Sequence, residues 1–186
     1  NLIYVLSRGV EEIGQRITRV TRDHEFLGQF GAAGRGDGQF VWPRSIDLDS
    51  AGNVFASDDF LHRISVFDKE GAFLSSWGTA GSGEGELNGP SGIAFDADDN
   101  LFVVDSANNR IQKFTKDGAF LGAFGHEGSD DGELDLPWGL CVGPDGGVYV
   151  ADWKNNRVQK FDTEGRFQVM FQGTENGVGD LHGPTG

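Results

Sequence analysis

The chain has 186 residues, including 30 glycines and 15 phenylalanines, and its formal charge is −14 because 29 acidic residues outnumber 15 lysines and arginines. This length fits one ordinary domain, and the negative charge argues against binding to the phosphate backbone of a nucleic acid. The sequence has no apolar run long enough to cross a membrane and no signal-peptide pattern at its first residue, so we expect a soluble protein and predict no compartment.

The sequence repeats itself with a fixed period. The segment DSANNRIQKFTKDGA at 105–119 returns as DWKNNRVQKFDTEGR at 152–166, a spacing of 152 − 105 = 47 residues. The same shift superimposes prolines, glycines and aromatic residues along the chain, for example Pro43, Pro90, Pro137 and Pro184. A period of this size predicts a repeat architecture.

This period divides the chain into consecutive units. In chain order they are a partial unit at 1–40, three complete units at 41–87, 88–134 and 135–181, and the start of a further unit at 182–186. The early part of the first unit carries about four extra residues before Arg16. We therefore expect one repeat domain without a linker.

Each complete unit contains the signals of four short strands. In the unit 88–134 these are GIAFD at 92–96, NLFVVD at 100–105, RIQKF at 110–114 and AFLGAFG at 119–125, separated by Asp-rich and Gly-rich turns. The second strand is apolar on both faces, as expected for a sheet packed between two neighbours. Four strands in each unit predict a β-propeller, whose blades are four-stranded sheets around a central channel. A solenoid or a sandwich is the less favoured alternative.

The order of these motifs resembles a known family. Pro-x-Gly with apolar residues, then NLFVVD or GVYVAD, then NNRIQKF or NNRVQKF, then FLGAFG, is similar to NHL repeats over essentially the whole chain. The resemblance implies an all-β propeller that most often has six blades. We expect about four blades in this chain, as a fragment of a longer ring or as a ring completed by self-association. A closed ring of four blades is the alternative.

Residues kept in every unit serve what every blade needs, which is usually folding. At the end of the second strand and the start of the third, the units keep an aspartate and an arginine: Asp58 with Arg63, Asp105 with Arg110, and Asp152 with Arg157. We interpret these residues as a structural ion pair or turn network. The lone Cys141, in the strand pattern GLCVG, is predicted to be a small buried thiol and not a nucleophile.

Variable positions on one end of the ring are the candidates for function. The loop from each fourth strand to the next first strand, and the loop from second to third strand, lie at the same end. Their variable residues are the predicted partner-binding residues Arg44, Phe60, Leu61, His62, Trp138, Trp153 and Lys154. An alternative for Trp138 and Trp153 is packing across blade junctions.

These observations favour a non-catalytic scaffold that binds a protein, a peptide or a glycan on this face, with no evident cofactor and no catalytic residue. The alternative, implied by propellers related to NHL repeats, is a metal-dependent enzyme of the lyase or lactonase type with calcium or zinc at the mouth of the channel. The four histidines, His24, His62, His126 and His182, occupy different phases of the repeat, and His62 and His182 share the candidate face.

Overall fold

The computed structural model describes residues 2–9, 14–173 and 181–185. Among these residues, three sheets have four antiparallel strands each and one sheet has three. The three-stranded sheet consists of β1 (Leu2–Ser7), β2 (Arg16–Thr21) and β3 (Phe26–Phe30). The second sheet consists of β6 (Pro43–Leu48), β7 (Val54–Asp58), β8 (Arg63–Phe67) and β9 (Phe73–Trp77). The loop between these two sheets contains the short strands β4 (Ala32–Ala33) and β5 (Gln39–Phe40).

The other two sheets repeat the second one. The third sheet consists of β10 (Pro90–Phe95), β11 (Asn100–Asp105), β12 (Arg110–Thr115) and β13 (Phe120–Phe124), with the single 3-10 turn η1 (Ser106–Asn108) after β11. The fourth sheet consists of β14 (Pro137–Val142), β15 (Val148–Asp152), β16 (Arg157–Phe161) and β17 (Phe167–Phe171). The all-β fold with four-stranded blades is confirmed. Residues 174–180 and 186, which belong to the last two predicted units, lie outside the described residues.

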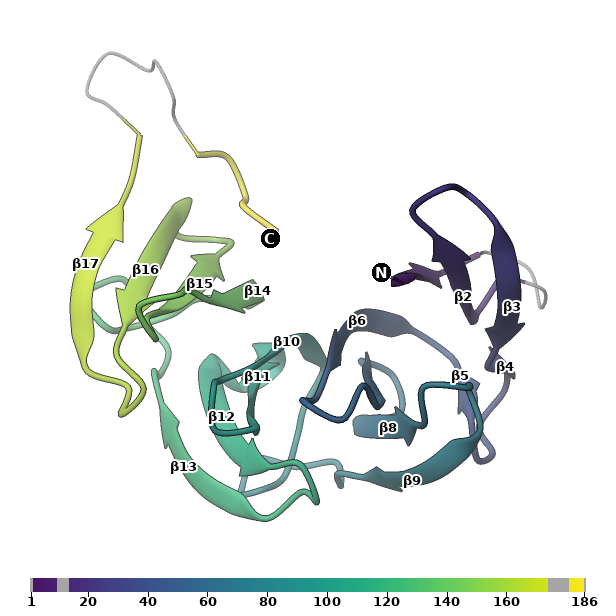
Figure 1. Cartoon of the computed structure of the whole chain (residues 1–186). Coiled ribbons are helices and arrows are strands. Elements are labelled where there is room, and N and C mark those ends of the chain that lie inside the picture. Colours follow the sequence, from purple (N-terminus) through teal and green to yellow (C-terminus); the bar gives the residue numbers. More distant parts are fainter. Residues whose placement is uncertain (1, 10–13, 174–180, 186) are drawn as a thin grey trace.

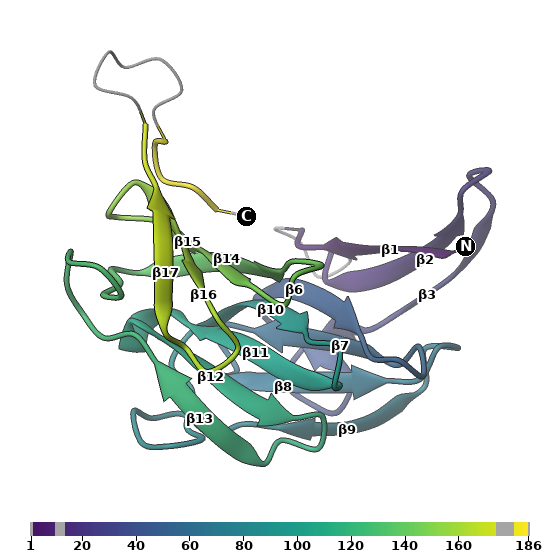
Figure 2. The same ribbon diagram turned by 60° about the vertical axis from the view of Figure 1, so that its left-hand side comes forward.

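The four sheets follow one another along an arc. Strands β6, β10 and β14 lie on the concave side, and β9, β13 and β17 lie on the outside (Figure 1). A second view shows the first and last sheets at opposite ends of the same arc (Figure 2). The first strand of each complete blade therefore faces the axis of the propeller, and its beginning opens onto one end of the channel. No helix among the described residues has the length and apolar character needed to cross a membrane.

The hydrophobic core lies between the sheets. One cluster joins Phe55 and Ile64 of the second sheet to Leu101 and Phe114 of the third, and equivalent clusters fill the other two junctions. Strands β7 and β11 are buried along nearly their whole length, which confirms the expectation that second strands have neighbours on both faces. Each blade therefore depends on its neighbours for burial of apolar surface.

Cys141 is exposed, so the prediction of a small buried thiol was wrong. Its repeat equivalent Ala94 is 8% exposed, since β10 packs against β14 of the following blade. On the side of β14 that carries Cys141, no following sheet is present among the described residues. The exposure of the thiol thus follows from its place in the last blade that the structure describes.

An aromatic residue at the end of each fourth strand packs on a glycine of the next blade. Phe30 lies on Gly71, Trp77 on Gly118 and Phe124 on Gly165, and all three glycines have positive φ in a hairpin turn. A Cβ atom at Gly118 would lie 2.6 Å from Cγ of Trp77. The glycine and the aromatic residue that recur in each unit thus contact each other across the junction between two blades.

We predict that Gly118→Ala lowers the free energy of unfolding by about 2–3 kcal/mol, because the new methyl group meets the Trp77 ring and φ stays in the left-handed region. Gly122→Ala is the control, since nothing lies within 4 Å of its Cβ position, and we expect it to change stability by less than about 0.5 kcal/mol. Urea unfolding of both variants measures the difference. Equal losses would show that the ring contact is unimportant.

The repeated aspartates are buried and attach the loops to the blades. Oδ1 of Asp152 accepts the backbone N–H of Asp135 at 2.8 Å, and its Oδ2 accepts Nε of Arg157 at 2.8 Å. Arg157 also donates to the carbonyl groups of Asp130 and Glu133 in the preceding loop. Asp105 and Arg110 repeat this arrangement.

The second blade satisfies its aspartate in another way. Asp58 accepts backbone N–H groups from Val41, Trp42, Phe60 and Leu61, while Arg63 donates to carbonyl groups of the preceding loop. Asp58 is therefore held by backbone amides, whereas Asp105 and Asp152 each also pair directly with an arginine. The same loop attachment is made with different donors.

This difference predicts unequal effects of one substitution at two equivalent positions. Arg157→Met leaves the buried carboxylate of Asp152 without its cation and is expected to cost about 3–5 kcal/mol of stability. Arg63→Met is expected to cost less than half as much, because Arg63 donates to backbone carbonyl groups and its loss removes no ion pair from Asp58. Urea unfolding compares the two variants, and a larger loss for Arg63→Met would contradict this account.

Candidate functional site

The candidate site lies at the end of the propeller where the first strands begin. The loops that lead into β6, β10 and β14 meet there with the loops that follow β7, β11 and β15. The aspartates described above hold both sets of loops, so their side chains project from a fixed backbone. Differences between blades at this end are mainly differences in side-chain size and chemistry, and the entry loop of the second blade also differs in its backbone at Trp42.

The blade in the middle carries small residues where its neighbours carry large ones. Its four variable positions are Gly89, Ser91, Ser106 and Ala107. The equivalent residues, 47 positions earlier, are Trp42, Arg44, Asp59 and Phe60, and those 47 positions later are Leu136, Trp138, Trp153 and Lys154. The third sheet thus forms a low floor between two higher walls.

This floor and these walls enclose a pocket of about 150 Å³. Arg44 and Asp59 line one side, Leu136 and Trp138 line the other, and the four small residues of the middle blade form the rest. The floor offers no free hydroxyl proton, because Ser91 Oγ donates to the Trp138 carbonyl at 2.6 Å and Ser106 Oγ donates to the Pro137 carbonyl at 2.7 Å. The floor therefore presents mainly apolar surface.

Arg44 and Trp138 close the pocket toward the channel, although they belong to blades that are not adjacent. The guanidinium carbon of Arg44 lies 4.6 Å from the centre of the Trp138 ring, above Ser91 of the blade between them. Arg44 Nε donates to Asp59 Oδ2 at 2.8 Å, and Nη2 donates to the same oxygen. On the channel side of this pair lies a second pocket of about 160 Å³, which Ser45, Gly92 and Leu140 help to line.

Further aromatic rings extend from this pair in both directions. The Trp153 ring lies 5.8 Å from that of Trp138, and the Trp42 ring lies 5.7 Å from the Arg44 guanidinium and 6.3 Å from the Phe60 ring. Trp42 and Phe60 are 50% and 44% exposed. We call the set Phe60, Trp42, Arg44, Trp138 and Trp153 the aromatic ridge. Exposed rings on a rigid scaffold are typical of binding hot spots.

The structure brings together four of the seven predicted partner-binding residues, namely Arg44, Phe60, Trp138 and Trp153. Lys154 lies on the same face, where its Nζ is 3.3 Å from Oδ1 of Asp135. Leu61 belongs to the turn, and its N–H donates to Asp58. Trp138 and Trp153 contact each other within one blade, and Trp138 also contacts Arg44 of another blade. The contact between blades is therefore present at Trp138, and recognition of a partner stays a prediction.

His62 has a structural role that the sequence analysis missed. It adopts φ 51°, and its Nδ1 accepts the N–H of Gly89 at 3.1 Å. Asn109 and Asn156 occupy the equivalent positions, with φ 53° and 52°, and their Oδ1 atoms accept the same kind of N–H from the next blade. The motif LHR therefore replaces NNR with another side chain that tolerates positive φ and offers an acceptor.

We expect His62→Asn to leave the free energy of unfolding unchanged within about 0.5 kcal/mol, because asparagine already makes this contact in two blades. His62→Ala should lose about 1–2 kcal/mol, since the Gly89 N–H loses its acceptor and alanine is disfavoured at positive φ. Thermal or urea unfolding of both variants checks this. A loss with asparagine equal to that with alanine would show that the acceptor is not what matters.

Trp42 and Leu136 are site residues that sequence reasoning did not select. Both occupy the position where the other units have Gly89 and Gly183, so the signal was a large residue in a glycine column. Leu136 has φ 46°, a strained conformation for leucine, and its N–H is held by Asn109 Oδ1 at 2.8 Å. Backbone strain of this kind is concentrated at functional sites, where it holds a side chain in a required position.

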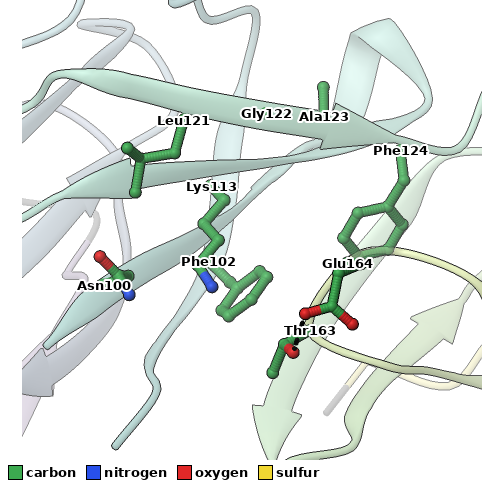
Figure 3. A pocket seen from close by; sticks show the side chains of 9 residues that line it. All are labelled: Asn100, Phe102, Lys113, Leu121, Gly122, Ala123, Phe124, Thr163 and Glu164. Carbon is green, nitrogen blue, oxygen red and sulfur yellow. Dashed lines mark hydrogen bonds between the residues drawn. The ribbon is translucent and has the colours of Figure 1, made fainter. Parts of the chain in front are cut away.

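A larger pocket, of about 420 Å³, lies at the outer side of the third blade (Figure 3). Lys113 lies between Phe102 and Asp96 there, with its Nζ 4.8 Å from the ring centre and 2.9 Å from Asp96 Oδ2. Burial raises the pKa of Asp96, but hydrogen bonds from Lys113 and Asn100 outweigh it and hold that pKa below its usual value. Because Lys160, Tyr149 and Asp145 repeat this arrangement in the next blade, we interpret the pocket as part of the blade framework.

The histidines do not converge in the described part of the chain. His62 binds the Gly89 N–H, and His126 lies 3.2 Å from Glu133 in an exposed loop. His24 has positive φ in a hairpin turn, and His182 lies beside Asn156 in a shallow hollow. Within the described residues, no group of three or more histidine, cysteine or acidic residues is placed to hold a metal ion.

Comparison with known proteins agrees with this architecture. The NHL repeat pattern matches residues 87–114 and 134–161. The human NHL repeat-containing protein 3 is 37% identical over 67 residues, which are 36% of this chain and 19% of that protein. The chain therefore spans about a fifth of this curated relative.

Solved propellers superimpose on most of the chain. An inactive variant of virginiamycin B lyase from Staphylococcus aureus, with quinupristin, has a TM-score of 0.65 at 18% identity over 94% of this chain and 56% of that one. A streptogramin B lyase has a TM-score of 0.68 at 14% identity over 100% of this chain and 62% of that one. At these identities the likeness shows the fold alone.

Proposed function

This chain is an NHL-repeat β-propeller, and from that premise we propose that it is a non-catalytic binding module which presents the aromatic ridge and its pocket to a protein, peptide or glycan. The observation that carries the proposal is the change in side-chain size along the repeat. Small residues in the third blade lie between large residues in the second and fourth. Folding of the repeat does not require this pattern, because each complete blade has the same four strands and a buried aspartate that holds its loops.

The chemistry of the ridge supports recognition rather than packing alone. Trp42 and Phe60 keep about half of their surface in solvent although a propeller core lies nearby. Arginine stacked on tryptophan is already partly ordered, so little side-chain entropy is lost when a partner covers it. Tryptophan and arginine are also the residues that most often dominate binding energy at protein interfaces.

We predict that Trp138→Ala weakens binding of a partner at least tenfold, because the change removes both the pocket wall and the surface on which Arg44 stacks. The measurement starts with ligands selected on the wild-type protein from a peptide display library and a glycan array, whose affinities are then compared by titration calorimetry. Leu121→Ala is the control, since Leu121 is 50% exposed on the outer strand β13.

Thermal unfolding of the same variants separates recognition from packing. If Trp138 is chiefly a recognition residue, its replacement should lower Tm by no more than roughly 4 °C, as expected for a loss of about 1 kcal/mol in a chain of this size. A much larger decrease, with affinity unchanged for the selected ligands, would assign the residue to the core. Ligands that bind equally well to wild type and to Trp138→Ala would contradict the proposed face.

A further inference from the structure

We infer that the partner is an extended peptide segment that inserts one uncharged, apolar side chain of about the size of a benzene ring into the pocket between Arg44 and Trp138. This inference rests on the proposed binding function and specifies its ligand. The relevant observations are the volume of the pocket, the bonding of its polar groups and the conformation of Leu136.

The volume fits one side chain and not a larger group. A cavity of about 150 Å³ with apolar walls accommodates a molecule such as benzene, and this pocket has the same volume, about 150 Å³. The side chains of phenylalanine, leucine and methionine are of that size. The Trp138 ring on one side and the small residues Gly89 and Ala107 below provide surfaces of matching shape.

The polar groups of the pocket already have partners. The two hydroxyl protons of Ser91 and Ser106 serve three close contacts: one between the two Oγ atoms at 2.6 Å, and one from each Oγ to a backbone carbonyl. Recognition of a sugar ring needs free donors and acceptors that match its hydroxyl groups, because a hydroxyl buried without a partner costs binding energy. The floor of this pocket has no hydroxyl proton left to donate, so an apolar group is the better fit.

Charge complementarity points to a neutral group. Arg44 binds Asp59 through Nε and Nη2, so the cation and the anion at the rim neutralise each other. A charged ligand group would have to displace one of them or be desolvated without a partner. A neutral apolar side chain enters beside the ion pair without disturbing it.

Leu136 sets one wall of the pocket at a cost in backbone strain. The equivalent positions on either side in the repeat are Gly89 and Gly183, where a side chain would meet Asp59 in one case and Trp153 in the other. In the middle position the facing residue is Ser106, which is small enough to leave space for leucine. A large residue at position 136 thus faces a small one at position 106, and Leu136 forms an apolar wall of the pocket. It does so with φ 46°, a conformation that is unfavourable for leucine.

The length of the aromatic ridge favours a chain-like ligand. Beyond the pocket, Trp42 and Phe60 continue the apolar surface toward the second blade, and the Arg35 guanidinium lies 4.9 Å from the Phe60 ring centre. An isolated small molecule in the pocket would leave these rings uncovered. A peptide whose anchor residue fills the pocket lays its neighbouring residues along the exposed rings.

The test fills the pocket with a side chain that the repeat already tolerates. Ala107→Phe introduces the residue found at the equivalent position 60. Twelve-residue peptides are selected from a display library on the wild-type protein, synthesised and titrated against each variant by calorimetry. The control, Ser75→Phe, adds the same ring to the exposed outer strand β9 and should leave affinities unchanged.

We expect the selected peptides to share one phenylalanine, leucine or methionine, and its replacement by alanine to weaken binding at least tenfold. Ala107→Phe should weaken binding of the original peptide at least tenfold, and it should add little further loss for the alanine peptide, since the two changes remove the same contact. Leu136→Gly, which copies Gly89 and Gly183, should weaken the original peptide roughly tenfold as well. If Ala107→Phe does not fold, Ala107→Lys, which copies Lys154, replaces it in the same cycle.

Three other results are distinguishable. Peptides that depend on Trp138 but bind Ala107→Phe as tightly as wild type would overturn the pocket inference and leave the binding function in place. Glycans that depend on Trp138, with no such peptide, would overturn the peptide inference alone. If no ligand of either class depends on Trp138, the proposed function itself fails, and the inference fails with it.

Discussion

The geometry of the candidate face depends on one buried carboxylate in each complete blade. Asp58, Asp105 and Asp152 end the second strands with no exposed surface, and each accepts the N–H group of a residue 17 positions earlier, in the loop that enters the blade. A buried carboxylate without such partners would be strongly destabilising, so the loop has little freedom to move away. The two loops of every blade are thereby fixed relative to its strands.

Side-chain size shapes most of this surface. The entry loops of the third and fourth blades match, because Gly89 and Leu136 both have positive φ and donate their N–H groups to a side chain of the preceding blade. In the second blade the N–H of Trp42 binds Asp58 instead, so that loop differs in its backbone as well. The small residues of the third blade leave space between the large residues on either side. This is why Arg44 reaches Trp138 across an entire blade. In a less regular protein, a pocket of this kind would require loops of different length.

The repeat also explains where the sequence-based predictions were incomplete. The rule that repeated residues are structural and variable ones functional selected Arg44, Trp138 and Trp153, which the structure brings together, but it overlooked the structural contact between His62 and Gly89. His62 breaks the repeat in sequence, but histidine shares two properties with the asparagine of the other blades. Both residues tolerate positive φ, and both have a side-chain atom that accepts a hydrogen bond. The prediction that Cys141 is buried was wrong for another reason, because the pattern of a strand does not reveal which of its faces has a neighbouring blade.

The sequence by itself determined the strands, their turns and their order, because these follow from local alternation, from glycine and aspartate in turns and from a period of 47 residues. It also determined which end of the propeller carries the variable residues. Only the tertiary structure decided that Arg44 and Trp138 meet, that Leu136 lines a pocket and that His62 supports a loop. Those facts depend on the curvature of the arc and on distances between residues far apart in the chain, and a one-dimensional pattern does not contain them.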